Sequence, residues 1–551
     1  MDKIWLKQYP PGVPAEVDIH QFASLRDLIE HSLATHAQRD AYVLMDKRLT
    51  YAQIDQLSAR FGAWLQQQGF AKGERIAVML PNLLQYPVVM LGAIRAGLVV
   101  VNTNPLYTAD ELRHQLNDSG ATAIVILENF CHVLQKVIGQ TAVRRVVVTQ
   151  VGDLLGFPKR LLVNSVLRWV KKAIPAWHID GALRLPAVLS SARGASLQPV
   201  ALNHDDLAFL QYTGGTTGVS KGAMLSHGNM VANVLQSRAW HEQVPIQHAT
   251  YVIALPLYHI FSLTANCLLY MLVGGCGILV PNPRDFPAFV RELIKHPPNT
   301  LNGVNTLFNA LMDSPDFKRI DFSGLVATMG GGMAVQAAVA ERWRLMTGCT
   351  LSQGWGLTET SPVVTATRMA DTQFNGSIGL PIPSTEVSVR NDDGSEVPLG
   401  GSGELCVRGP QVMKGYWQRP DETANVMLPD GWLRTGDVGR MDGDGWFYIE
   451  DRKKDMITVS GFKVYPNEVE AVAVRHPGVF EAAAVGQPDP HSGEIVTLYV
   501  VRRTPDVSAD DIIAFLRQSL TSYKVPRKVF FRDSLPKTNV GKILRRALRE
   551  T

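Results

Sequence analysis

The chain has 551 residues, of which 46% are hydrophobic and 19% charged, and its net charge of +4 gives no argument for a nucleic-acid partner. That length suggests several domains. The five cysteines form no CxxC pair and the N-terminus lacks the apolar run of a signal peptide, which argues against a disulfide framework or a zinc site and favours the cytoplasm.

Strand-like and helix-like segments alternate in the first half of the chain. Apolar runs at 74–80, 98–102 and 121–127 predict short buried strands. The segments 84–97 and 111–120 predict helices that end at a glycine. Helices alternating with short apolar strands imply a mostly parallel sheet covered by helices, so we expect an α/β fold here.

One uncharged segment, Leu263–Val280, is about as long as a membrane-spanning helix must be. Gly274, Gly275 and Gly277 interrupt it, and glycine is unfavourable inside a helix. We predict instead a buried helix to about Val273, then a turn and a short buried strand.

The region Gly152–Arg193 contains a basic amphipathic segment, 157–177, in which lysine and arginine are mixed with leucine, valine and tryptophan. A helix of this kind can lie on an anionic membrane surface, which would place the protein peripherally on the inner face of the membrane. The alternative is a solvated helix that packs on the body and covers apolar surface with its lysine stems. We favour the second interpretation because surface helices are common.

The sequence becomes rich in turns past about Gly400, with Asp-Gly pairs that predict β-hairpins. After Pro466 helix and strand alternate again. Ser508 and Asp511 have the spacing of a capping box at the start of an apolar helical stripe.

The change in texture predicts a domain boundary near Asp451–Lys454. We expect an N-terminal domain of residues 1–451 and a C-terminal domain of residues 452–551, and the latter is of normal domain size.

The stretch Gln211–Leu225, QYTGGTTGVSKGAML, combines glycines, hydroxyl side chains and a lysine. Its glycines let backbone N–H groups approach an anion, and the lysine adds positive charge. It follows the predicted strand 207–213, so it should lie at a sheet edge where ligands commonly bind. Two residues separate its last glycine from the lysine, unlike the usual phosphate loop. The expected phosphate contacts are Thr213, Gly214, Gly215, Thr216, Thr217, Gly218 and Lys221.

This stretch resembles the phosphate loop of the adenylate-forming superfamily, which includes acyl-CoA synthetases, luciferases and peptide-synthetase adenylation domains. The segment 430–456 resembles a signature of the fatty acyl-CoA synthetases, and the segment 80–108 is similar to bacterial long-chain fatty-acid–CoA ligases. Further motifs similar to those of the superfamily follow in its order over nearly the whole chain. They are LPLYHIF (Leu255–Phe261), GGGMA (Gly330–Ala334), QGWGLTET (Gln353–Thr360), RTGD (Arg434–Asp437), DRKKDMITVSGFKVYPNEVE (Asp451–Glu470) and PKTNVGKILRR (Pro536–Arg546).

The resemblance implies an α/β fold with a large N-terminal domain, made of two helix-covered sheets and a small β-barrel-like part, and a small mobile α+β lid. It also implies an AMP-forming ligase, in which a carboxylate attacks the α-phosphate of ATP and pyrophosphate leaves. The thiol of coenzyme A then displaces AMP. Attack of one anion on another is opposed by charge, so the reaction needs positioning and cations, Mg²⁺ among them.

The resemblance also assigns roles around ATP. Glu359 would hold Mg²⁺, which prefers oxygen ligands, and Thr358 would contact phosphate. Trp355 would stack on adenine, although a core tryptophan is the structural alternative. Asp437 would accept hydrogen bonds from the ribose hydroxyls unless it forms an Asx-turn, and Arg452 would reach the ribose.

The remaining expected contacts concern the backbone and the acyl group. Gly331 and Gly332 would let the backbone approach the adenine and the acyl carbonyl. His259 occupies a position where the family has an aromatic gate to the acyl site, but a histidine among apolar residues is often a core residue. The other residues expected at the ATP site are Gln353, Gly354 and Gly356.

Lys542 follows Gly541 on a loop before the last predicted helix. By resemblance it bridges the carboxylate and the α-phosphate during adenylation, and with Glu359 and Thr213 it forms the expected catalytic set. For thiolysis the lid is expected to rotate about Lys454, with Asp451 and Lys453 left open as alternative hinge positions. After rotation, the residues expected to contact coenzyme A are Ser460, Gly461 and Lys463.

The expected activity is that of a long-chain fatty-acid–CoA ligase whose acyl tail occupies an apolar tunnel, since each buried methylene contributes about 0.8 kcal/mol. The nearest alternative is a ligase for medium-chain or aryl acids. A non-catalytic membrane fatty-acid binder is disfavoured by the intact loop, Glu359 and Lys542. The sequence leaves open the tunnel residues, the base for the thiol and the oligomeric state, a homodimer included.

Overall fold

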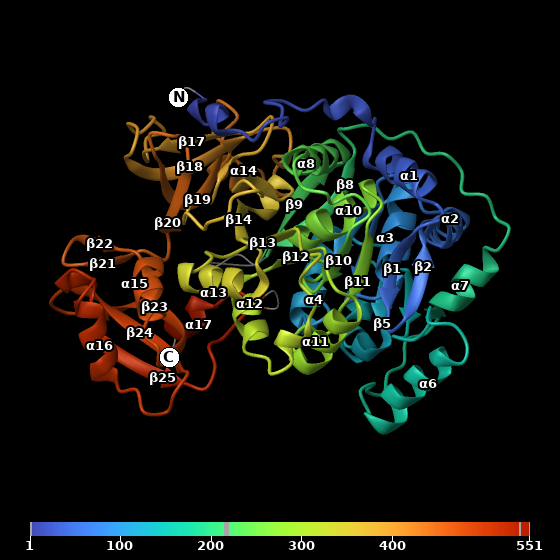
Figure 1. The fold of residues 1–551 in the computed structure, drawn as a ribbon. Coiled ribbons are helices and arrows are strands. Elements are labelled where there is room, and N and C mark those ends of the chain that lie inside the picture. Colours follow the sequence, from blue (N-terminus) through green and yellow to red (C-terminus); the bar gives the residue numbers. More distant parts are fainter. Residues whose placement is uncertain (1–2, 214–219, 539–540, 550–551) are drawn as a thin grey trace.

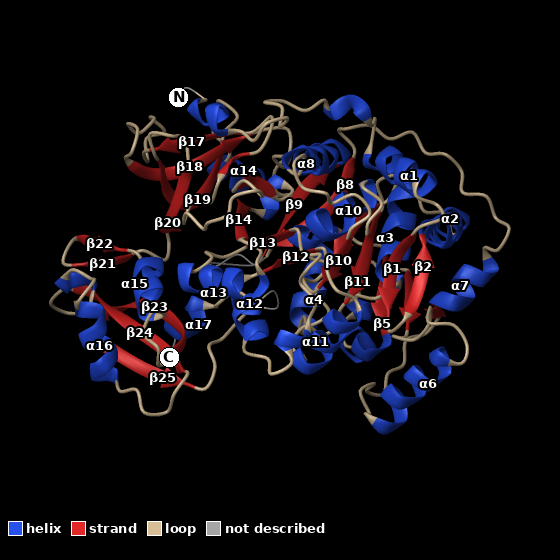
Figure 2. Cartoon of the chain, viewed as in Figure 1, coloured by secondary structure: helices blue, strands red, loops and turns tan. Residues whose placement is uncertain are grey.

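The computed structural model describes residues 3–213, 220–538 and 541–549. These residues form four sheets with helices packed around them (Figures 1 and 2). Figure 1 shows the two large sheets at the centre and right, a small sheet at the upper left and the C-terminal domain at the lower left. The predicted α/β class, with a large N-terminal domain and a small C-terminal domain, is confirmed.

The larger sheet has nine strands. Its strands from β14 to β1 are parallel to one another. At the edges, β15 is antiparallel to β14, β16 is antiparallel to β15, and β2 is antiparallel to β1. The central strands β12 and β13 are buried along their whole length, as expected for parallel strands covered on both faces. In spatial order the strands are β16 (Leu380–Pro381), β15 (Val363–Ala366), β14 (Leu351–Gly356), β13 (Ala327–Gly331), β12 (Thr300–Gly303), β10 (Thr250–Ile253), β11 (Cys276–Leu279), β1 (Asp40–Leu44) and β2 (Lys47–Thr50).

The second large sheet has seven strands, of which β9 alone is antiparallel to its neighbour within the described residues. The predicted strands at 74–80, 98–102, 121–127 and 207–213 all belong to it and are confirmed within one or two residues. In spatial order its strands are β7 (Leu183–Arg184), β6 (Arg145–Thr149), β5 (Ala123–Leu127), β3 (Arg75–Met79), β4 (Val99–Asn102), β8 (Leu207–Thr213) and β9 (Lys221–Ser226).

Helices begin and end where local sequence signals place them. Thr108 caps α4 in a capping box with Glu111, and Gly120 ends the helix in the left-handed conformation. The helices around the two large sheets are α1 (Leu25–Thr35), α2 (Tyr51–Gln67), α3 (Gln85–Arg95), α4 (Ala109–Ser119), α5 (Cys131–Gln135), α7 (Leu185–Ser191), α8 (His227–Trp240), α9 (Ile260–Ser262), α10 (Leu269–Leu272), α11 (Phe286–Lys295), α12 (Asn305–Met312) and α13 (Ala337–Thr347).

The uncharged segment Leu263–Val280 is a buried helix followed by a strand, as predicted. A π-helical part, Leu263–Leu268, continues into α10, and β11 follows after a turn at Gly274. No helix in the described part of the chain is long and apolar enough to cross a bilayer.

A small antiparallel sheet connects the large sheets to the C-terminal domain. Its strands follow chain order, β17 (Glu386–Arg390), β18 (Ser402–Arg408), β19 (Leu433–Met441) and β20 (Phe447–Arg452), and α14 (Pro420–Val426) lies between β18 and β19. The predicted Asp-Gly hairpin joins β19 to β20. Arg452, the first residue of the expected lid, still pairs with Asp437 of β19, and Lys453 N donates to Gly436 O at 2.9 Å.

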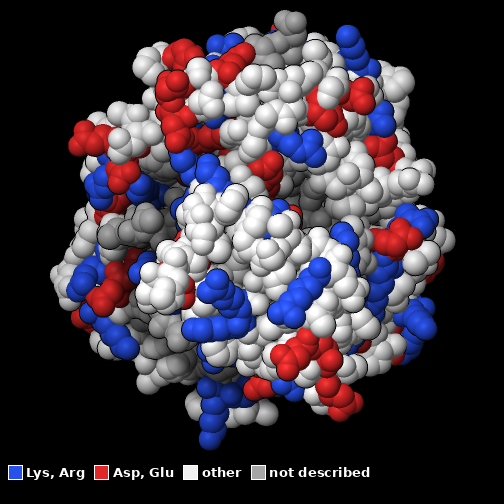
Figure 3. Space-filling view, turned by 90° about the vertical axis from the view of Figure 1, so that its left-hand side faces the viewer, with Lys and Arg blue, Asp and Glu red and all other residues white. Residues whose placement is uncertain are grey.

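The C-terminal domain has a hydrophobic core of its own, formed by residues between 457 and 525. The predicted capping box at Ser508 and Asp511 is present at the start of α16. Figure 3 shows basic and acidic side chains spread together over the face at this end of the molecule. The elements are β21 (Ile457–Val459), β22 (Phe462–Val464), α15 (Pro466–Ala473), β23 (Val479–Asp489), β24 (Gly493–Arg502), α16 (Ala509–Arg517), β25 (Lys528–Arg532) and α17 (Arg545–Arg549).

Candidate active site

A cavity of about 710 Å³ lies at the carboxyl ends of β4, β8, β13 and β14, where the C-terminal domain meets the large sheets. Such an edge is the usual ligand site of open α/β sheets. Most of the described residues that the motifs single out line this cavity, although they are far apart in sequence. They are Thr213, Lys221, His259, Gly331, Gly332, Gly354, Trp355, Gly356, Thr358, Glu359, Arg452, Lys454 and Lys542.

The glycine-rich segment leaves the sheet beside this cavity. Thr213 and Lys221 are paired across β8 and β9, so they close the base of the segment. The Lys221 ammonium pairs with Glu422 and lies 5.3 Å from the centre of the Tyr416 ring. Five predicted phosphate contacts lie outside the described residues: Gly214, Gly215, Thr216, Thr217 and Gly218.

Glu359 presents its carboxylate to the cavity from the turn after β14. Tyr416 Oη donates a hydrogen bond of 2.7 Å to Glu359 Oε1, and Met413 N donates to Glu359 O at 2.8 Å. Burial and the neighbouring carboxylate of Glu359 raise the pKa of Tyr416, so its hydroxyl stays a donor. The side chain of Glu359 is thereby held in one position.

Tyr416 is a site residue that the sequence analysis missed. It reaches the cavity because a bridge with Ala223 and a bond from Trp417 N to Gly222 O join its segment to the edge of β9. Neither periodicity nor a turn signal in the local sequence can indicate that two segments nearly two hundred residues apart are paired. Tyr416 could have been identified by comparing the segment around it with the corresponding segment of the family.

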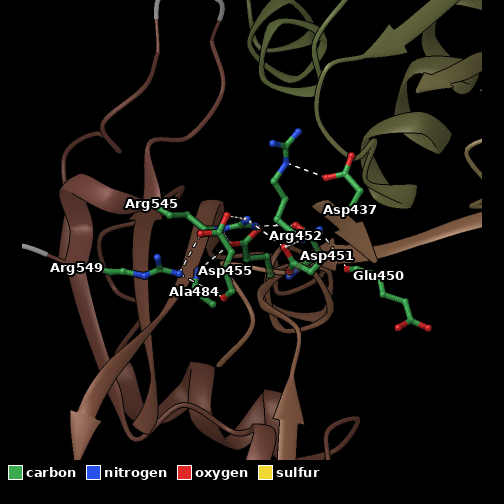
Figure 4. Close-up of polar contacts among 10 residues, drawn as sticks. Asp437, Glu450, Asp451, Arg452, Asp455, Ala484, Arg545 and Arg549 are labelled. Carbon is green, nitrogen blue, oxygen red and sulfur yellow. Dashed lines mark hydrogen bonds and ion pairs between the residues drawn. The ribbon is translucent and has the colours of Figure 1, made fainter. Parts of the chain in front are cut away.

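A second group of interacting side chains consists of Asp437, Trp355 and Arg452. The indole Nε1 of Trp355 donates to Asp437 Oδ2 at 2.8 Å, and Arg452 Nε lies 3.0 Å from Asp437 Oδ1 (Figure 4). Asp437 is 1% exposed, and its Oδ1 accepts no hydrogen bond of proper geometry from the described residues. A buried carboxylate oxygen with unused acceptor capacity suits a hydroxyl donor of a ligand.

Lys542 reaches the cavity from a tight turn of the C-terminal domain. Thr538 N donates to Lys542 O at 2.7 Å, and Lys542 N donates to Thr538 Oγ1 at 3.1 Å. Thr306 of α12 donates to Gly541 O at 3.0 Å, which ties this turn to the N-terminal domain. A Cβ atom on Gly332, whose φ is +76°, would lie 3.1 Å from Lys542 Cε, so glycine is needed there.

The electrostatic environment of Lys542 is mixed. Burial and, to a smaller extent, the positive charge of Arg452 lower the pKa of Lys542 to about 8, although the negative charges of Asp437 and Glu359 oppose this shift. Burial likewise lowers the pKa of Lys454 to about 8. An anionic ligand in this cavity would therefore meet several cations that are only partly neutralised.

His259 both lines the cavity and caps a helix. Its Nδ1 accepts a hydrogen bond from Phe261 N at 3.3 Å at the start of α9. Burial, with a smaller effect of Lys542, lowers the pKa of His259 to about 3, so the ring is neutral at physiological pH.

Apolar side chains complete the cavity. Phe261 packs so closely on Gly331 that an added Cβ there would lie 3.0 Å from its ring. Further apolar lining comes from Leu106, Ile260, Met329 and Val363. The cavity therefore joins a polar, charged part to apolar surface.

Five of the predicted residues that the structure describes do not line the cavity. Asp437 is one of them, although it contacts Trp355 and Arg452, which do line it. Gln353 is buried, where its side chain accepts from Val335 N at 2.7 Å and donates to Ser377 O at 2.6 Å. It therefore supports the strand rather than lining the cavity. The predicted coenzyme A contacts belong to the exposed hairpin of β21 and β22 and do not line the cavity in this orientation of the C-terminal domain. They are Ser460, Gly461 and Lys463.

The fold and the cavity define an adenylate-forming enzyme. A family model described as AMP-binding enzyme matches residues 29–417, and one described as AMP-binding enzyme C-terminal domain matches residues 468–542. The chain therefore belongs to the AMP-binding enzyme family, as its motifs predicted.

Two curated relatives illustrate the range of the family. The chain is 52% identical over 554 residues to a long-chain-fatty-acid–CoA ligase of Escherichia coli O157:H7, with 100% of this chain and 98% of the relative covered. It is 36% identical over 504 residues to a feruloyl-CoA synthase of Amycolatopsis sp, with 91% and 93% covered.

Among solved structures, the anthranilate CoA ligase AuaEII in complex with anthranoyl-AMP superposes with a TM-score of 0.86. The match covers 97% of this chain and 98% of that chain at 23% identity. At this identity the similarity supports the fold alone.

Proposed function

We propose that this protein is a long-chain-fatty-acid–CoA ligase, an AMP-forming acid–thiol ligase that works through an acyl-adenylate. The observation that carries this proposal is the 52% identity to such a ligase over the full length of both chains. Lys542, Glu359 and Arg452 line one cavity, and Asp437 pairs with Arg452 beside it, which supplies the matching chemistry.

In the first step, the carboxylate oxygen of the fatty acid attacks the α-phosphorus of ATP, and pyrophosphate departs with the electrons of the broken P–O bond. Lys542 lies where a compact cation can stabilise the negative charge that develops between acid and phosphate. Thr213 and Lys221 lie at the base of the glycine-rich segment, in reach of the leaving phosphates.

Mg²⁺ is proposed as the second source of positive charge. Within the described residues no three His, Cys, Asp or Glu side chains cluster as a metal site. A single carboxylate is nevertheless the usual protein contribution to Mg²⁺ that is held mainly by substrate phosphates and water. Glu359, positioned by the Tyr416 hydroxyl, fits this role, and the bound ion would neutralise charge on the phosphates.

We propose that the nucleoside of ATP is bound by Asp437, Arg452 and Trp355. Asp437 contacts Trp355 and Arg452, which both line the cavity, and its carboxylate would accept hydrogen bonds from the ribose hydroxyls. Trp355 supplies an aromatic wall, fixed in orientation by its hydrogen bond to Asp437. Gly354 and Gly356, together with Thr358, complete the cavity beside it.

For the second step we propose that the C-terminal domain rotates about Lys454. The backbone hydrogen bond from Lys453 N to Gly436 O ties Lys453 to the small sheet, and Lys454 follows directly at the end of that sheet, where hinges are often found. Rotation would withdraw Lys542 and bring the exposed β21–β22 hairpin to the cavity. Gly461, with a φ of +84° and open space around it, would then let the thiol arm of coenzyme A pass.

The preferred length of the acyl chain distinguishes the proposed long-chain ligase from its nearest alternative. A ligase for medium-chain or aryl acids shares this fold, as the feruloyl-CoA synthase relative illustrates. Steady-state rates across saturated acids of increasing length, plus ferulate, should give the highest kcat/KM for long chains. A short or aromatic acid that exceeds palmitate-length acids by about tenfold would overturn the long-chain assignment.

The pH dependence of adenylation should report the ammonium of Lys542. Because the protonated form is required, kcat/KM for ATP is expected to fall as the pH rises through about 8, the pKa of Lys542 in the free enzyme. Bound phosphates favour the charged form, so the fall in kcat should occur at higher pH.

The variant Lys542→Arg is the control for this pH profile. Arginine stays charged at all accessible pH values, so its lower activity should lack the alkaline fall. If this variant loses activity at alkaline pH as the wild type does, a group other than Lys542 causes that loss.

We further propose that the segment 157–170 contacts the membrane peripherally. It forms α6 (Lys159–Ser165) and a π-helical turn that project from the lower right of Figure 1. Phe157, Leu162 and Trp169 are 85%, 65% and 73% exposed, which is more than a helix packed on the body would show. The exposed ammonium groups of Lys171 and Lys172 follow directly and suit an anionic lipid surface.

Replacing Phe157, Leu162 and Trp169 by serine should lower the fraction of protein that sediments with phosphatidylglycerol vesicles by about fivefold. Because these side chains are exposed, the fold should be retained. Leu345→Ser removes an equally exposed leucine of α13 and should have no effect on sedimentation. Equal sedimentation of both variants would exclude this segment as the anchor.

A further inference from the structure

A buried cluster of charged side chains joins the last helix of the chain to the end of β20 (Figure 4). At its centre is the guanidinium of Arg545 in α17. Its Nη2 lies 2.8 Å from Glu470 Oε2 and 2.6 Å from Asn467 Oδ1. Its Nη1 lies 3.5 Å from Asp451 Oδ1 and 3.6 Å from Asp455 Oδ2.

Only one of these four partners precedes Lys454. Asp451 belongs to β20 and pairs in register with Val438 of the small sheet, so it is fixed to the N-terminal domain. The other three partners follow Lys454 and belong to the C-terminal domain with Arg545 itself. Rotation about Lys454 would carry these residues together and separate them from Asp451.

Asp451 is bonded on both sides of this junction. Its Oδ1 accepts from Arg452 N at 2.7 Å, and its Oδ2 accepts from Asn467 N of α15 at 2.8 Å. The side chain is 1% exposed, and burial raises the pKa of Asp451 to about 6. Asp451 thus meets the C-terminal domain through one backbone amide and one guanidinium, both shielded from water.

Within the described residues, a second ion pair joins the parts of the chain before and after Lys454, and it is more exposed. Arg503 of the C-terminal domain pairs with Asp313 of the N-terminal domain at 3.2 Å, but the two side chains are 38% and 30% exposed. Exposed ion pairs contribute little and are screened by salt, whereas charges in a buried site interact more strongly. The orientation of the C-terminal domain should therefore depend on the buried contact.

We propose that Asp451 and Arg545 form a latch that holds the C-terminal domain in the orientation for adenylation. The proposal rests on the two-step reaction and on the hinge at Lys454. Arg545 is three residues from Lys542, so the latch positions the catalytic ammonium without touching the substrate. Opening the latch would favour the orientation for thiolysis, because a shift in population follows the difference in contacts between two states.

The test compares the two half-reactions in variants of the latch. Asp451→Asn and Arg545→Lys should each lower single-turnover pyrophosphate release from fatty acid and ATP by about tenfold. Thioester formation from supplied acyl-adenylate and coenzyme A should stay within about twofold of wild type. Because the two residues act on one contact, the double variant should be no slower than the slower single variant.

Arg549→Lys is the matched control. Arg549 lies on the same helix and pairs with Asp455 at 3.0 Å, a contact entirely within the C-terminal domain. This variant should keep both half-reactions near wild-type rates. Equal loss of both half-reactions in the latch variants, or no loss, would overturn the latch.

A second measurement does not depend on activity. Trypsin should cut after Lys453 or Lys454 about fivefold faster in the two latch variants than in wild type or Arg549→Lys, because a released domain exposes the linker. Unchanged cleavage would refute the latch even if adenylation is slow. Absence of pyrophosphate release from wild-type protein would instead refute the proposed activity. The rates of trypsin cleavage would then still show whether the latch exists.

Discussion

Replacing Lys542 by alanine is expected to lower the rate of acyl-adenylate formation by about 100- to 1,000-fold, the usual loss when one preorganised group that stabilises transition-state charge is removed. The ammonium is buried against Gly332 and close enough to Arg452, Asp437 and Glu359 for their charges to act on it. Alanine would therefore remove the positive charge at this place.

The same variant should leave the second half-reaction intact. Thiolysis of supplied acyl-adenylate needs no cation between acid and phosphate, so its rate should stay within about threefold of wild type. The measurement is pyrophosphate release in one assay and thioester formation from acyl-adenylate in the other. Lys524→Ala, which removes a lysine paired with Glu468 within the C-terminal domain, should change neither. Loss of both half-reactions in Lys542→Ala would contradict the separation of roles.

Replacing Glu359 by glutamine is expected to lower adenylation by about 100-fold and to raise the Mg²⁺ concentration for half-maximal rate at least about tenfold. Glutamine keeps the shape of the side chain and can still accept the hydrogen bond of the Tyr416 hydroxyl. The variant therefore removes the negative charge with little change in geometry. The rate should be measured as a function of free Mg²⁺ at saturating ATP and fatty acid.

Glu111 provides a matched control for this variant. Its carboxylate also lines the cavity but serves the capping box of α4, where it accepts from Thr108 N at 2.8 Å. Glutamine is equally suitable at that capping position, so Glu111→Gln should alter neither the rate nor the Mg²⁺ requirement. A Glu359→Gln variant with an unchanged Mg²⁺ requirement would show that Glu359 does not hold the ion.

Much of the fold follows from local sequence signals. Strands β3, β4 and β5 of the seven-stranded sheet were predictable because both faces are buried, which leaves apolar runs in the sequence. The helix from Leu263 was predictable as buried because the glycines after Val273 end it too early for a membrane span. Caps such as Ser508 with Asp511 are also local, and they appear where the spacing places them.

The site was predictable only in part, because its residues meet through long-range contacts. Ordered motifs singled out Glu359, Asp437 and Lys542, but not the Tyr416 hydroxyl that fixes Glu359. Gln353 was expected at ATP because it belongs to a motif, whereas its amide bonds to the backbone of two neighbouring loops, at Val335 and Ser377. Pairing between distant segments leaves no periodic trace in either of them.

The latch illustrates the same point. In the sequence Asp451 is one of several positions near a domain boundary, and Arg545 is one basic residue among several. Their separation of nearly one hundred residues gives no reason to connect them. Only the packing of α15 and α17 against the end of β20 brings the carboxylate and the guanidinium together.

The central claim is that a carboxylate oxygen attacks the α-phosphorus of ATP in this cavity. Incubation with ATP, Mg²⁺, coenzyme A and palmitate labelled with ¹⁸O in its carboxylate tests it most directly by mass spectrometry of the nucleotide product. The account predicts AMP that carries one ¹⁸O atom, together with unlabelled pyrophosphate. Formation of ADP with orthophosphate, or of AMP without the label, would contradict it.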